Sequence, residues 1–192
     1  MTADVKRVSN ILDRRFEGHW KQAEVGLYVL AAVAAWIVRF VQDDAFITYR
    51  YARNLARGNG LVFNPGERVE GYTNFLWTVM HVIPEKLGWS SPIFSQVIGI
   101  ALMVATVAVT LRLARRLFSS QSFGFLVALT LLANMTFLTY ATGGLETMQQ
   151  TLLVVSVAAL LLPVTETARG VAARGVAARR VGAGLCAGLA VL

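Results

Sequence analysis

Long apolar segments constrain what this chain can fold into more than any other feature of its sequence. Four of them occupy residues 25–41, 93–111, 123–140 and 148–162, and a fifth begins at 181 and runs to 192. A helix needs about 20 mostly apolar residues to cross a bilayer. The chain is also 56% hydrophobic and only 15% charged, whereas soluble domains carry about 25% charged residues. We therefore predict an all-α integral membrane protein, built as a polytopic bundle of transmembrane helices.

The two ends of the chain each leave an alternative open. The segment 181–192 is shorter than a complete span, which predicts an N-terminal fragment of a longer protein rather than a natural end with a short helix. Residues 25–41 contain an Ala-Val-Ala signal-peptidase pattern. However, the apolar run continues beyond it and the preceding segment is long and partly acidic, so a membrane span is the favoured interpretation.

Basic residues predict the orientation of the bundle. Most Lys and Arg side chains outside the loop 42–92 lie in segments 1–24, 112–122 and 163–180. Because basic segments stay in the cytoplasm, these three are predicted to be cytoplasmic, and 42–92 and 141–147 to lie outside. The formal net charge of +7 then reflects topology and does not indicate binding to nucleic acid.

The predicted outer loop 42–92 contains signals for local structure. Residues 44–57 are expected to form a helix that ends at Gly58 and Gly60. The Asn-Pro-Gly-Glu turn at 64–67 favours a small hairpin between flanking strands. Residues 74–83 are apolar but too short to cross a bilayer, so they are predicted to be an interfacial helix.

Three arginines of this loop are candidates for binding an anion. Arg50, Arg53 and Arg57 are spaced three and four residues apart and therefore share one face of a helix. Such a stripe can hold the phosphate of a lipid carrier, or it can simply anchor the helix to lipid headgroups. The residues alone support the two interpretations about equally.

Two adjacent carboxylates directly follow the first predicted span. Asp43 and Asp44 stand at the start of the expected helix, where an aspartate is a favoured N-cap. Residues i and i+1 of a helix point in different directions, so a second role is open. One carboxylate is expected to cap the helix and the other to act as a general base.

The stretch DDAFITYRYARNLARGNGLVFNPGERVEGYTNFLW, from Asp43 to Trp77, resembles the first outer loop of bacterial membrane glycosyltransferases of the GT-C class. It is most similar in pattern to actinobacterial proteins related to the terminal β-(1→2)-arabinofuranosyltransferases. The resemblance implies a sugar donor carried on polyprenyl phosphate and a catalytic Asp at position 43 or 44. It also implies that Glu146, in the outer loop 141–147, contributes to the site.

We therefore expect a multi-pass glycosyltransferase of the plasma (inner) membrane, with its N-terminus in the cytoplasm and its active loop outside. It would invert the sugar, an arabinofuranose or a hexose, as it passes to a glycan, lipid or protein acceptor of the cell envelope. The 192 residues of this chain alone are expected to be inactive. No cofactor is required, although a divalent cation could bind at Asp43 and Asp44. The candidate substrate-binding residues are Arg50, Arg53, Arg57, Arg68, Glu70, Tyr72, Asn74 and Glu146. The alternatives are a non-catalytic transporter or flippase and an assembly subunit.

Overall fold

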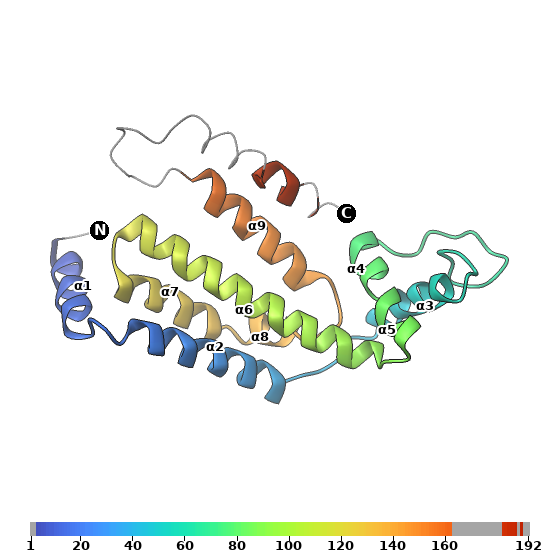
Figure 1. The fold of residues 1–192 in the computed structure, drawn as a ribbon, viewed down its shortest axis with the longest axis horizontal. Helices are drawn as coiled ribbons and strands as arrows, with labels where there is room; N and C mark the ends of the chain where they lie inside the picture. Colours follow the sequence, from blue (N-terminus) through green and yellow to red (C-terminus); the bar gives the residue numbers. More distant parts are fainter. Residues whose placement is uncertain (1–2, 163–181, 188, 190–192) are drawn as a thin grey trace.

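The protein is described by a computed structural model that covers residues 3–162, 182–187 and 189. Over these residues all of the regular secondary structure is helical (Figure 1). The elements from residue 3 to 162 are α1 (Ala3–Arg15), α2 (Trp20–Ile37), α3 (Ala45–Ala56), α4 (Phe75–Met80), α5 (Val82–Leu87), α6 (Ser91–Phe118), α7 (Gln121–Leu132), α8 (Met135–Tyr140) and α9 (Thr147–Leu161). Residues 182–187 are also helical. The whole of the predicted basic loop 163–180, together with residue 181, lies outside the described residues.

Helix α6 is the centre of the fold, and helices α2, α7 and α9 pack against it. The packing relies on small side chains, because Ala31 and Ala35 of α2 are fully buried against Met103 of α6. Small residues let helix backbones approach closely. Gly99 of α6 shows the limit of this approach, since a Cβ there would lie 2.0 Å from the carbonyl oxygen of Ala141.

The outward faces of these helices are apolar. The more exposed side chains include Val25, Val29, Ile37, Val97, Leu126 and Val154. Such extensive exposed apolar surface marks a partner or a lipid environment. Among the described residues, α6 is the helix that is long and apolar enough to cross a membrane, whereas α7 and α9 are shorter apolar helices.

The predicted third span, 123–140, is not one continuous helix. It is divided into α7 and α8, because Asn134 adopts an extended conformation with ψ 108°. Its side chain accepts a hydrogen bond from the backbone N–H of Phe137 and thereby caps α8. The prediction of a single helix was wrong because it did not consider that the polar Asn134 could interrupt the apolar run.

The other predicted boundaries shift in ways that matter for charge. Helix α6 continues to Phe118, so Arg112, Arg115 and Arg116 lie on its last turns and not in a connecting loop. Helix α2 begins at Trp20, before the predicted start at 25. Its Glu24 forms an ion pair with Arg115, which joins α2 to the end of α6.

The small helices α3, α4 and α5 form a compact unit at one end of the long helices, and α1 lies at the opposite end (Figure 1). The expected helix 44–57 corresponds closely to α3, and the expected interfacial helix 74–83 is divided between α4 and α5. The hairpin predicted around 64–67 does not form, since residues 61–72 contain no strand.

Candidate functional site

Arg50 and Arg53 of α3 and Arg57, the C-cap residue of that helix, line one cavity of about 680 Å³. This placement confirms that they share a face of the helix. The cavity is bounded by the segment that follows α3 and by the start of α6, and its other walls include Phe46, Ile47, Tyr49, Phe63, Pro65 and Pro92. A cluster of cations beside apolar walls can hold an anion attached to a hydrophobic group.

The arginines differ in how strongly protein groups already engage them. Arg50 donates to the carbonyl of Phe63 at 2.8 Å and to Asn64 Oδ1 at 2.6 Å, and its guanidinium lies over the Phe63 ring. Arg53 forms an ion pair with Glu85 at 3.0 Å. The backbone N–H of Arg57 donates to the carbonyl of Arg53, but its guanidinium has no hydrogen bond or ion pair with any residue that the structure describes. Arg57 is therefore the cation whose charge is most available to a ligand.

Glu85 of α5 fixes the position of Arg53. Its Oε1 also accepts a hydrogen bond from Ser91 Oγ at 2.6 Å. Burial by itself would raise the pKa of Glu85, but the hydrogen bonds from Arg53 and Ser91 and the nearby Arg57 charge outweigh it and lower the pKa. Glu85 therefore stays ionised at neutral pH and partly compensates the charge of the cavity.

A second group of polar side chains joins the start of α4 to the turn before α9. Asn74 Nδ2 donates to Thr48 Oγ1 at 3.1 Å and to Glu146 Oε2 at 2.9 Å. Asn74 Oδ1 accepts from Thr78 Oγ1 at 2.9 Å. Two predicted site residues, 72 positions apart in the sequence, are thus in direct contact. Glu146 is the N-cap residue of α9 but its side chain does not cap the helix, so its carboxylate serves this tertiary contact.

The turn before α9 is held in place from two sides. Trp77 Nε1 donates to the carbonyl of Gly144 at 2.9 Å, and the backbone N–H of Gln42 donates to the carbonyl of Gly143 at 2.9 Å. Trp77 is almost completely buried. These bonds hold the predicted outer turn 141–147 against α4 and against the segment that precedes α3.

His81 is a buried residue of this unit that the sequence analysis did not select. Its ring is fully buried between Trp77, Tyr49 and Phe94. Nδ1 lies 2.8 Å from the carbonyl of Trp77, an acceptor, so the proton of the neutral ring is on Nδ1. Burial lowers the pKa of His81. The sequence signal that could have identified His81 is that it is a polar residue within the apolar run 74–83.

Arg68, Glu70 and Tyr72 lie away from the arginine stripe. They line a separate cavity of about 520 Å³ beside residues 59–62. Tyr72 packs edge-on against Tyr51, at 4.8 Å between ring centroids. The structure therefore divides the predicted substrate-binding residues among two cavities and the Asn74–Glu146 contact.

Asp43 and Asp44 are exposed, and neither lines either of these cavities. Asp44 is the N-cap residue of α3, but its side chain makes no capping hydrogen bond. Their backbone carbonyls accept from Phe46 and Ile47, two residues of the arginine cavity. The carboxylate pair thus lies about one helical turn from that cavity. The expected division into one capping and one free aspartate is not observed, and the catalytic and cation-binding roles stay predictions.

These features define a helical protein with a long apolar helix and, at one end of it, a small unit that holds a three-arginine cavity. The chain is similar to the terminal β-(1→2)-arabinofuranosyltransferase of Mycobacterium tuberculosis, with 40% identity over 75 residues, which is 38% of this chain and 12% of that protein. It is also similar to the enzyme of the same name from Corynebacterium glutamicum, with 49% identity over 49 residues, 26% of this chain and 7% of that protein. No family model and no solved structure matches the chain.

The matched stretches span about a tenth of the length of these curated relatives. They support a relationship to arabinofuranosyltransferases and, in general terms, a glycosyltransferase function. Together with the long apolar helix, they weakly suggest a membrane location.

Proposed function

We propose that this chain is part of a polytopic membrane glycosyltransferase of the GT-C type. The enzyme transfers an arabinofuranose or a hexose from a polyprenyl-phosphate donor to a glycan, lipid or protein acceptor on the outer face of the membrane. The cavity shared by Arg50, Arg53 and Arg57 carries this proposal, and the local similarity to arabinofuranosyltransferases supports it.

Charge is separated along the long helices in a way that supports an outer location for the arginine cavity. The basic residues of α1 lie at the same end of the fold as Arg112, Arg115 and Arg116, which are on the last turns of α6. The α3–α5 unit lies at the other end (Figure 1). If α1 is cytoplasmic, as the distribution of basic residues favours, the arginine cavity faces outward.

The arginine cavity has the chemistry to bind the donor phosphate. Arg57 supplies a charge without a protein partner among the described residues, and Arg50 is held by neutral acceptors that an anion can replace. Charge-assisted bonds from guanidinium groups are stronger than bonds to neutral acceptors. The apolar walls formed by Phe46 and Ile47 would contact the first isoprenoid units.

In the proposed reaction, Asp43 or Asp44 removes the proton of the acceptor hydroxyl. The hydroxyl oxygen forms a bond to the anomeric carbon from the face opposite the phosphate. The bond between the anomeric carbon and the phosphate oxygen breaks, and the electron pair leaves with polyprenyl phosphate. The arginines stabilise the charge that develops on this leaving group. Glu146 and Asn74 would contact the sugar or the acceptor.

The catalytic assignment is tested by Asp43→Asn and Asp44→Asn in the full-length protein. Asparagine is about as good an N-cap as aspartate but cannot act as a base. Loss of a general base lowers the rate about 10²–10⁴-fold, so one of the two variants should lose nearly all transfer at unchanged expression. Glu17→Gln, which removes an exposed acid near α1, is the matched control. Full activity in both Asn variants would show that this pair is structural and would favour a non-catalytic transporter or assembly subunit.

Donor binding is tested by Arg57→Gln, with Lys86→Gln as the control. Lys86 is an exposed cation on the same unit that lines neither of the two cavities. Hydrogen bonds to charged groups contribute about 1.5–3 kcal/mol, so KM for the polyprenyl-phosphate donor should rise about 10–150-fold. A similar KM for the two variants would place the phosphate elsewhere.

A further inference from the structure

Helix α1 is fixed to the start of α7 by a carboxylate that caps a neighbouring helix. Asp13 accepts hydrogen bonds from the backbone N–H groups of Ser122 at 2.7 Å and Gln121 at 3.1 Å. Burial by itself would raise the pKa of Asp13, but these backbone bonds and those from the hydroxyl groups of Ser120 and Ser122 outweigh it and lower the pKa. The C-terminal part of α1 is therefore anchored at a defined place against α7.

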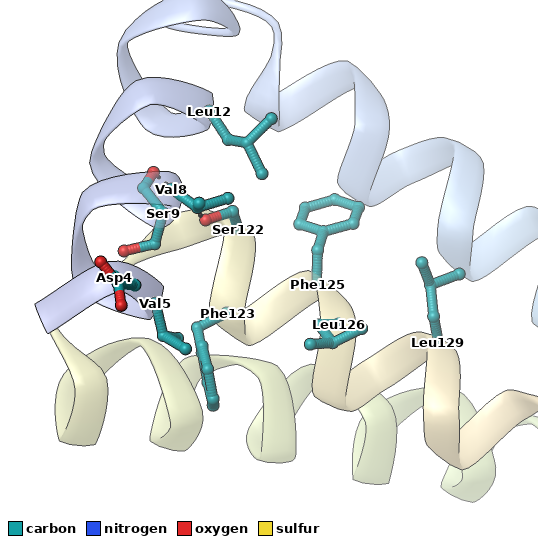
Figure 2. A pocket seen from close by; sticks show the side chains of 10 residues that line it. All are labelled: Asp4, Val5, Val8, Ser9, Leu12, Ser122, Phe123, Phe125, Leu126 and Leu129. Carbon is teal, nitrogen blue, oxygen red and sulfur yellow. Dashed lines mark hydrogen bonds between the residues drawn. The ribbon is translucent and has the colours of Figure 1, made fainter. Parts of the chain in front are cut away.

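The remainder of α1 does not close onto α7. A cavity of about 480 Å³ lies between the two helices, and Figure 2 shows the side chains that line it. Most of the lining is apolar, with Val5, Val8 and Leu12 from α1 and Phe125, Leu126 and Leu129 from α7, and the polar residues in it are Asp4, Ser9 and Ser122. Water has few hydrogen-bond partners in such a lining, so an apolar occupant is favoured over water.

We propose that this cavity binds an acyl chain of an anionic phospholipid from the cytoplasmic leaflet. The inference goes beyond glycosyl transfer but rests on the proposed orientation of the helices in the membrane. Leu126 and Leu129 are 57% and 48% exposed, so the apolar lining continues onto the outer surface of α7, where membrane lipid would have direct access. A chain that enters there covers apolar surface that α1 leaves open.

The charge of α1 selects the headgroup. Helix α1, which forms one wall of the cavity, carries four exposed bases, Lys6, Arg7, Arg14 and Arg15, against the two acids Asp4 and Asp13, so its net charge is positive. Cytoplasmic leaflets are rich in anionic lipids, which attract basic segments close to the membrane surface. The proposed site therefore combines an apolar cavity for one chain with a basic helix for the headgroup.

The test uses the full-length protein in nanodiscs that contain phosphatidylglycerol and phosphatidylcholine, one of them carrying a photoactivatable diazirine on an acyl chain. Mass spectrometry of the irradiated protein should locate adducts on Val5 and Val8 of α1 as well as on Leu126 and Leu129. Labelled phosphatidylglycerol should exceed labelled phosphatidylcholine at α1 by about fivefold for each basic residue engaged. Lys6→Gln combined with Arg7→Gln should reduce this preference.

Two variants that fill the cavity make the test specific. Val8→Trp and Leu126→Trp each place a large ring in the cavity, one from α1 and the other from α7. Loss of α1 adducts in both variants would show that the cavity is filled, even if one of the substitutions also displaces α1 from α7. Val25→Trp, at a 62% exposed position of α2 outside the cavity lining, is the matched control and should label as the unchanged protein does.

Adducts on the exposed face of α9, at Val154 and Leu161, report membrane placement independently of the cavity. If those residues are labelled but α1 is not, the acyl-chain proposal is overturned while the membrane orientation stands, as would happen if another segment or a second copy covered the cavity. Adducts on α1 that persist unchanged in both filling variants would also overturn it, as would equal labelling of α1 by the two lipids.

Discussion

Gly144 is the position at which the local backbone and the tertiary contacts of the site can be tested together. It lies in the turn before α9 with φ +88°, and its carbonyl accepts the hydrogen bond from Trp77. An added Cβ would lie 2.5 Å from the Tyr49 hydroxyl and 2.6 Å from the Ala45 Cβ. Gly144→Ala therefore imposes both a left-handed backbone on alanine and a steric overlap with α3.

Gly66→Ala is the control that separates the cost of the left-handed backbone from the cost of the steric overlap. Gly66 has a similar φ of +91°, but an added Cβ there meets no atom within 4 Å. Both alanine variants carry the left-handed penalty of about 1–2 kcal/mol. Only Gly144→Ala also carries the overpacking cost of about 1–3 kcal/mol, so it should be the less stable variant by that amount.

The measurement compares apparent unfolding midpoints of the two full-length variants in the same detergent and at one heating rate, since membrane proteins often unfold irreversibly. A difference of about 1–3 kcal/mol corresponds to about 2–12 °C for a folded unit of this size. Transfer activity should also fall more in Gly144→Ala, because the turn carries the Glu146 contact to Asn74. Equal midpoints for the two variants would refute the packing of this turn against α3.

Three further outcomes follow from the structure. Because burial lowers the pKa of His81, its contribution to stability should be complete above about pH 6.5 and fall as the pH decreases toward the folded-state pKa; His81→Gln should flatten this dependence in a tryptophan-fluorescence titration, and identical profiles would contradict the buried neutral ring. Asp13→Ala should cost about 0.5–2 kcal/mol and speed amide hydrogen exchange at the start of α7, whereas unchanged exchange there would mean that α1 does not cap it. With Cys186 replaced by Ala, Val69→Cys should react with an impermeant thiol reagent added outside and Ser119→Cys should not; the reverse pattern would invert the proposed topology.

Several features of the site could be predicted because they depend on local periodicity. The arginine stripe is one of them, since residues three and four apart necessarily share a helical face and the ends of α3 follow from local turn signals. The helical character of the apolar segments is another, as their length and composition favour helices.

Other features depended on contacts between distant segments. The expected hairpin fails because side chains of α3 bind the carbonyl groups that its strands would have needed: Tyr51 donates to Val69, and Asn54 to Val62 and Phe63. No pattern around 64–67 reveals this competition.

The sequence by itself thus determined an apolar, helical chain with a basic stripe after its first long helix, because composition and the helical repeat act over a few turns. Only the tertiary structure decided which groups meet. It paired Arg53 with Glu85, left Arg57 without a partner among the described residues, and brought Glu146 to Asn74. These outcomes depend on how helices far apart in sequence pack, and the free energy of that packing is set by side-chain shape and burial at each contact.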